Sequence, residues 1–209
     1  TPVWKTWLGI APKDEPAGLP RGRRRSLELM PRPKRSFSPE AIYHVIARGN
    51  RRQPIFLGDP DCRLFLEIVR RVVVERQWTV HSYCLMPNHY HMVLETPAGD
   101  LSAGMRELNG AYAQWFNRLH GFAGHVFQGR FKAILVASDW HLLELARYLA
   151  TNPSRAGLCA RAALWRWSSY PWVITRSAQG FAPSNKLLSF FGTDEASARD
   201  AMRRFIEDE

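Results

Sequence analysis

The sequence contains few cysteines and no long apolar run. Its three cysteines, Cys62, Cys84 and Cys159, are far apart and form no C-x-x-C pair, which argues against a disulfide framework and against a zinc site of four thiolates. No segment approaches the roughly 18 consecutive apolar residues that a membrane-spanning helix needs. The apolar residues 4–10 are too few for a secretory signal, and they precede the basic residues instead of following them. We therefore expect a protein of a reducing compartment, the cytoplasm, with no membrane partner.

Acidic residues are also scarce. The chain has 29 lysines and arginines against 19 acidic residues, a net charge of +10. Such an excess favours a polyanionic partner, usually nucleic acid. Apolar residues make up 45% and charged residues 23% of the 209 residues, which is ordinary for a globular protein and excludes wholesale disorder.

The basic excess is concentrated at the start of the chain. Residues 1–36 hold nine lysines and arginines, three acidic residues and many prolines and glycines. A segment of this composition cannot bury enough apolar surface to order itself. We therefore expect a flexible basic arm over residues 1–38, either a phosphate-binding tail or a solvated leader. A folded domain over residues 39–176 and a C-terminal extension over residues 177–209, with one amphipathic helix, follow it.

The hydrophobic pattern of the middle domain alternates between strands and helices. Strands are expected near residues 42–47, 78–86, 89–96 and 130–136, and helices near residues 59–73, 101–119 and 139–152. The last of these helices is expected to stop at Pro153. The order β-α-β-β-α-β-α predicts an α+β fold of the split β-α-β (ferredoxin- or RRM-like) type. In this fold an antiparallel sheet carries helices on one face and leaves the other face, or an edge, for a ligand.

Two pairs of residues carry recognisable chemistry. His89 and His91 alternate with Tyr90 in a strand, so both imidazoles lie on one side of the sheet. Tyr148 and Asn152 are four residues apart and share a helical face. Two imidazoles and an amide oxygen suit Mg²⁺ or Mn²⁺ when phosphate oxygens complete the shell. A phenol beside that phosphate would be placed for nucleophilic attack on a phosphodiester.

Each feature also has a plainer interpretation. The histidines could be half-exposed strand residues, the tyrosine a core residue and the asparagine a helix cap. The aromatic residues 165–172 could stack unpaired bases, although a lid packed over the sheet is favoured. A zinc site of Cys84, His89 and His91 lacks a fourth ligand nearby.

Four segments, in order, are similar to a known family. They are residues 43–56 (YHVIARGNRRQPIF), 83–91 (YCLMPNHYH), 124–133 (GHVFQGRFKA) and 147–158 (RYLATNPSRAGL). The chain thereby resembles the REP-associated tyrosine transposases and their insertion-sequence-200-like relatives, and His89-Tyr90-His91 resembles the HUH motif of single-strand DNA endonucleases. The resemblance covers about residues 40–175.

The resemblance implies a role for each matched residue. Tyr148 would be the nucleophile, and His89, His91 and Asn152 would hold Mg²⁺ or Mn²⁺. The reaction would cleave and rejoin single-stranded DNA through a 5′-phosphotyrosine intermediate. The partner would be single-stranded or hairpin DNA of a bacterial nucleoid. A monomer is favoured over a homodimer.

Several polar residues of the matched segments are suited to holding DNA. Basic side chains neutralise backbone phosphates, and the others position a base. The candidates are Arg48, Arg51, Arg52, His125, Gln128, Arg130 and Lys132. Two other functions stay open: a domesticated hairpin-DNA-binding protein without transposition activity, and a relaxase or replication initiator, for which the chain is short.

Overall fold

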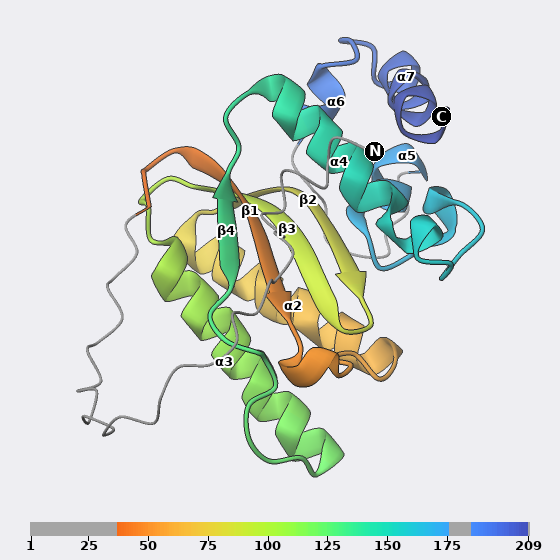
Figure 1. Ribbon diagram of the computed structural model, residues 1–209. Coiled ribbons are helices and arrows are strands. Elements are labelled where there is room, and N and C mark those ends of the chain that lie inside the picture. Colours follow the sequence, from red (N-terminus) through yellow and green to blue (C-terminus); the bar gives the residue numbers. More distant parts are fainter. Residues whose placement is uncertain (1–36, 176–184, 209) are drawn as a thin grey trace, which may run out of the picture. The chain divides into compact units, whose positions relative to one another are not determined.

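The computed structural model describes residues 37–175 and 185–208, which belong to one compact unit. Four strands, β1 (Ala41–Arg48), β2 (Thr79–Met86), β3 (His89–Thr96) and β4 (Lys132–Leu135), form a sheet in the order β2-β3-β1-β4 (Figure 1). Every neighbouring pair is antiparallel. The α+β class and the split β-α-β order predicted from the sequence are confirmed. The expected arm at residues 1–38 lies, up to residue 36, outside the described residues.

The helices follow the apolar periodicity of the sequence. They are α2 (Asp59–Arg76), α3 (Leu101–His120), α4 (Asp139–Arg155), α5 (Ser169–Thr175), α6 (Lys186–Ser189) and α7 (Glu195–Glu207), with 3₁₀ turns at η1 (Asn50–Arg52) and η2 (Ala162–Leu164). The helix predicted over residues 139–152 was expected to stop at Pro153. This prediction is wrong, because α4 continues through Pro153 to Arg155. The chain keeps its helical path there since the amides of Ala156 and Leu158 donate to the carbonyls of Asn152 and Pro153, at 3.0 and 2.9 Å.

One face of the sheet is covered by α2 and α3. Alternate residues of the strands, among them Val45, Tyr90 and Met92, point into this layer and are fully buried. Aromatic rings fill its centre: the Phe65 ring lies 4.6 Å from that of Tyr90 and 5.1 Å from that of Tyr112, between ring centroids. This layer is the main hydrophobic core.

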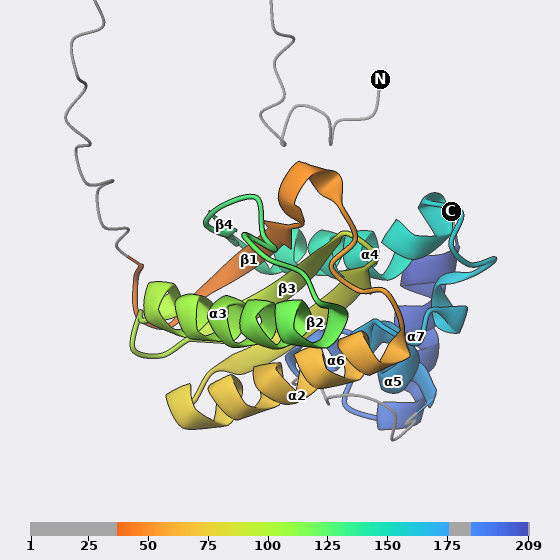
Figure 2. The same cartoon turned by 90° about the horizontal axis from the view of Figure 1, so that it is seen from below.

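The opposite face is covered in part by α4, with α5, α6 and α7 beside it. The interleaved strand residues Cys84, Met86 and Val93 pack there against Leu142 and Leu149 of α4. Figure 2 shows α2 and α3 on one side of the sheet and α4 on the other. Helices therefore cover both faces, and not one face as expected, because the second face also carries apolar strand residues that α4 buries.

The aromatic segment after η2 closes the edge of β2. The indole of Trp165 donates to the carbonyl of Leu85 at 2.9 Å, and the amide of Leu85 donates to the carbonyl of Trp167 at 2.8 Å. Tyr170 is buried. These contacts support the lid interpretation over base stacking, and a strand edge paired in this way is not open to another chain. Residues 171–172 of this segment lie in α5.

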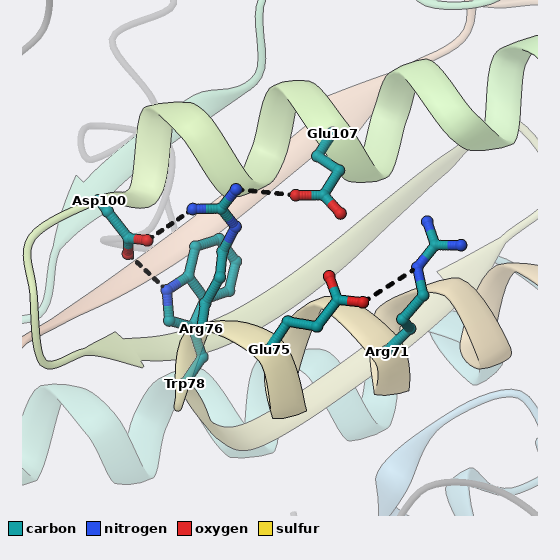
Figure 3. Close-up of polar contacts among 6 residues, drawn as sticks. All are labelled: Arg71, Glu75, Arg76, Trp78, Asp100 and Glu107. Atoms are coloured by element: carbon teal, nitrogen blue, oxygen red, sulfur yellow. Dashed lines mark hydrogen bonds and ion pairs between the residues drawn. The ribbon is translucent and has the colours of Figure 1, made fainter.

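A polar cluster joins the ends of α2 and α3 (Figure 3). Arg76 donates to Asp100 and to Glu107, each at 2.8 Å, and the indole of Trp78 donates to Asp100 at 2.7 Å. Trp78 is buried, and a Cβ atom on Gly104 would lie 2.3 Å from its ring. The close approach of α3 to this ring therefore requires glycine at position 104.

Within the described residues, none of the helices combines the length and apolar character that crossing a membrane demands.

Candidate metal and nucleophile site

His89 and His91 open strand β3, directly after the Pro87–Asn88 turn. Their rings lie 4.9 Å apart, between centroids, on the face of the sheet that α4 covers. His91 is 3% exposed, and its Nε2 atom is buried without a hydrogen-bond partner. A buried nitrogen with no partner is rare in folded proteins and calls for an explanation, such as a bound ion. The strand alternation predicted from the sequence is confirmed.

Both imidazoles are held in the neutral form that a metal ligand requires. Burial, and then the charge of Arg48, lowers the pKa of His89 to about 4. Burial lowers the pKa of His91 well below its ordinary value, and His44, His89 and Arg48 add to the effect. The Nδ1 atom of His89 lies 2.7 Å from the Oδ1 atom of Asn88. Because an amide oxygen only accepts, Nδ1 of His89 carries the proton and its Nε2 keeps a lone pair.

Helix α4 brings Tyr148 against this pair. Ser138 caps the helix by accepting from the amide of His141 at 3.2 Å, and Leu145 and Leu149 are buried on the apolar side of α4. The Tyr148 ring then meets the ring of His91 edge-on, at 88° and 5.6 Å between centroids. The nucleophile and a metal ligand predicted from separate parts of the sequence are neighbours in space.

Asn152 lies one turn further along α4, on the same helical face as Tyr148. Burial raises the pKa of Tyr148, whereas Asn152 and the positive charges of Arg48 and Arg155 act to lower it. Asn152 is therefore close enough to the tyrosine to influence its phenol, and its amide oxygen is a ligand type that suits a divalent ion.

His44 and Arg155 also belong to this site, although they were not singled out as site residues from the sequence. The Nε2 atom of His44 lies 2.9 Å from Nδ1 of His91. Both residues lie within the family-like segments 43–56 and 147–158, which is the one signal that could have found them. Their proximity depends on the β1–β3 register and on the packing of α4, which spacing along the chain does not give.

Four of the DNA-binding candidates meet around the turn before His89. The Gly49 amide donates to the carbonyl of Asn88 at 2.8 Å, the Asn88 side chain donates to the carbonyl of Arg52 at 3.0 Å, and the Gln128 amide donates to the carbonyl of Arg48 at 2.9 Å. Arg51 and Arg52 adopt left-handed backbone angles.

The chain can bend this sharply after β1 because Gly49 has no side chain. A Cβ atom at position 49 would lie 2.1 Å from the carbonyl oxygen of Gln53. The side chains of Arg48, Arg51, Arg52 and Gln128 are exposed at this end of the sheet.

The other three candidates lie on the connection from α3 to β4. His125 and Arg130 are exposed, as is Lys132, which begins β4 and pairs with Ile46 of β1. All seven candidates stay predictions.

The alternative zinc site is not supported. Residues 37–175 and 185–208 contain no cluster of three histidine, cysteine or acidic side chains able to hold a metal. Cys84 pairs with His91 across β2 and β3 but is fully buried, and burial raises the pKa of its thiol. Cys84 therefore stays protonated, whereas a zinc ligand is a thiolate.

The chain is similar to a known protein family and to solved structures. A family model described as "Transposase IS200 like" matches residues 38–152, more than half of the chain. A solved structure of a REP-associated tyrosine transposase bound to a REP hairpin is similar over 74% of this chain and 93% of that chain, with 18% identity and a TM-score of 0.59. The similarity to this solved structure shows that the two chains share a fold.

A structure described as a transposase of Deinococcus radiodurans R1 matches 56% of this chain and 94% of that chain, with 18% identity and a TM-score of 0.41. No curated protein matches the chain.

Proposed function

Because the chain belongs to the IS200-like transposase family, we propose that it cleaves and rejoins single-stranded DNA with Tyr148 as nucleophile. The family resemblance carried by the four motifs is thereby confirmed. The observation that supports the chemistry is the Tyr148 ring lying 5.6 Å from the ring of His91, whose Nε2 atom is buried and unpartnered. A tyrosine and a histidine with a purely structural role would not require an unpartnered ring nitrogen buried beside the phenol ring.

In the proposed step the Tyr148 oxygen attacks the scissile phosphorus in line. A tyrosine–phosphate bond forms to the 5′ side, the bond to the 3′ oxygen breaks, and that oxygen leaves as a hydroxyl. The reverse attack by a 3′ hydroxyl restores the DNA and frees the tyrosine, so no water is consumed. Burial raises the pKa of Tyr148 overall, and Asn152 and the charges of Arg48 and Arg155 oppose this increase. The two arginines also place positive charge where a phosphate would bind.

The residues of the site fit a divalent cation. His89 and His91 each offer an Nε2 lone pair, and Asn152 offers its amide oxygen, which makes a mixed nitrogen and oxygen set that suits Mg²⁺ or Mn²⁺. When bound, such an ion polarises the phosphate and stabilises the charge of the transition state.

The proposed substrate is a hairpin with a single-stranded flank. Arg48, Arg51 and Arg52 expose their guanidinium groups at the end of the sheet where His89 lies, and such groups hold phosphates without reading sequence. The similar solved structure has a REP hairpin bound, which motivates this choice of substrate. Since the nucleophile and the histidines lie in one chain, we propose that a monomer carries a complete site.

The test is formation of a covalent adduct. Protein, Mn²⁺ and 5′- or 3′-labelled hairpin DNA are incubated and resolved by denaturing gel electrophoresis. We expect an SDS-stable adduct that carries the DNA 3′ of the cut, and its loss in Tyr148→Phe with hairpin affinity preserved. Tyr170→Phe is the matched control, because this hydroxyl donates to Glu207 and not to the site. Adduct formation by Tyr148→Phe would refute the assignment.

The same assay addresses the alternative of a binding-only protein. Tight hairpin binding by the wild-type chain with no adduct in Mn²⁺ or Mg²⁺ would favour that alternative over the enzyme.

A further inference from the structure

Two histidines from neighbouring strands are in contact beside the nucleophile. The β1–β3 register pairs His44 with Val93 and His91 with Ile46, so the two histidines are diagonal neighbours on the same face of the sheet. The Nε2 atom of His44 lies 2.9 Å from Nδ1 of His91, with ring centroids 5.1 Å apart and planes at 24°. Both side chains are buried.

A contact of 2.9 Å between two ring nitrogens requires one proton between them. If Nε2 of His44 held it, neutral His91 would carry its own proton on Nε2. That atom is buried and without a partner, so it would be a donor that neither the protein nor a cation satisfies. If Nδ1 of His91 holds the proton, His44 accepts it and the buried Nε2 of His91 presents a lone pair instead.

We propose that His44 is a positioning residue, which accepts a hydrogen bond from Nδ1 of His91 and so fixes the tautomer and ring orientation in which Nε2 of His91 binds a divalent cation. Ligating histidines commonly donate their second ring proton to such an acceptor, and loss of the acceptor weakens metal binding. The inference rests on the proposed function, because it needs the metal site of His89, His91 and Asn152.

The position of His44 suits it to this role. It lies in β1, which is paired on both sides, opposite Val93 of β3 and Ile134 of β4. Its side chain is 6% exposed, so the ring has little room to turn. His89 obtains the equivalent restraint from a different acceptor, Oδ1 of Asn88 at 2.7 Å. The two predicted imidazole ligands are thus each held at Nδ1.

The experiment measures Mn²⁺ affinity by titration calorimetry without DNA, so that its readout does not depend on activity. We expect His44→Leu, which keeps the volume and removes the acceptor, to lower the affinity about 10- to 100-fold. We expect His44→Gln, whose amide oxygen can still accept, to stay within about threefold of the wild type. The matched control is His81→Leu, because His81 is equally buried and lies 2.9 Å from Glu95 at the far end of the β2–β3 hairpin.

Nitrogen-15 NMR of the unaltered protein provides an independent measurement. The His91 ring is expected to carry its proton on Nδ1, and the test stays valid even where His44→Leu does not fold. Unchanged Mn²⁺ affinity in His44→Leu, or a proton on Nε2 of His91, would overturn the positioning role. If His91→Ala also bound Mn²⁺ like the wild type, the proposed metal site itself would fail. Loss of binding in His91→Ala alone would remove only the role of His44.

Discussion

The two faces of the sheet are built from the same strands but differ in what they bury. Toward α2 and α3 the strands present Val45, Tyr90 and Met92, all of them packed in an aromatic and aliphatic core. Toward α4 the same strands present His44 and His91. Because strand side chains alternate, one residue step along β3 separates a core position from a site position.

The difference shows how a marginally stable domain accommodates a reactive site. On the α2/α3 face two buried tyrosine hydroxyls are satisfied locally: the Tyr90 hydroxyl donates to Asn109 at 2.6 Å, and the Tyr112 hydroxyl donates to the carbonyl of Ile55. The α4 face leaves Nε2 of His91 buried and unpartnered. An unsatisfied buried group costs free energy, which the apolar packing of the two layers must offset.

The adjacent residues Tyr90 and His91 give the largest expected contrast. Tyr90→Ala removes a fully buried ring that packs on Phe65, and we expect it to lower the free energy of unfolding by about 3–5 kcal/mol. His91→Ala should destabilise the metal-free protein far less, because it also removes the unpartnered nitrogen, yet it should abolish adduct formation. Urea unfolding of both variants, with the adduct assay, measures the contrast.

If the two substitutions destabilised the protein equally, the inference that Tyr90 serves mainly stability and His91 mainly the site would be contradicted. Tyr90→Phe is the control for the hydroxyl, since it keeps the ring and loses the bond to Asn109 alone. We expect it to cost about 1 kcal/mol.

The same contrast shows which features of the fold and of the site could be predicted from the sequence. Alternation placed His89 and His91 on one side of a strand, and helical spacing placed Tyr148 and Asn152 on one face, and the structure confirms both. The contact between His44 and His91 could not be predicted in that way, because it depends on which residue of β1 lies opposite which residue of β3. The covering of the second face depends on long-range packing of α4, α6 and α7.

The histidines of the α4 face make stability depend on pH. Burial, followed by the charges of His141 and Lys132, lowers the pKa of His44 to about 4. Between about pH 6.5 and pH 4 the unfolded chain binds a proton at this position and the folded chain does not, so protons favour unfolding. The stability due to neutral His44 is complete above pH 6.5 and is lost as the pH falls toward 4. We expect His44 alone to account for a loss of about 3 kcal/mol in the metal-free protein.

Urea unfolding at a series of pH values measures this loss. His44→Gln does not titrate and should flatten the dependence. A wild-type stability that stays constant from pH 7 to pH 4 would show that folding does not lower the pKa of His44.

A smaller contrast lies within the packed layer, on helix α3. A Cβ atom on Gly104 would lie 2.3 Å from the Trp78 ring and 2.7 Å from Cδ of Arg76, and the ring is held by its bond to Asp100 (Figure 3). Gly104→Ala must displace this ring, so we expect it to lower the free energy of unfolding by about 1–3 kcal/mol. Chemical denaturation measures the loss.

Gly110 gives the smallest effect and the opposite sign. It lies in the same helix, is exposed, and a Cβ atom there would meet no atom within 4 Å. Alanine has the higher helix propensity, so Gly110→Ala should raise the free energy of unfolding by up to about 1 kcal/mol. If Gly110→Ala raises the free energy of unfolding and Gly104→Ala lowers it, the close packing of the α2/α3 layer depends on its contact with Trp78. If both substitutions raise the free energy of unfolding, the Trp78 ring moves aside at little cost. The packed face would then be less rigid than its burial indicates.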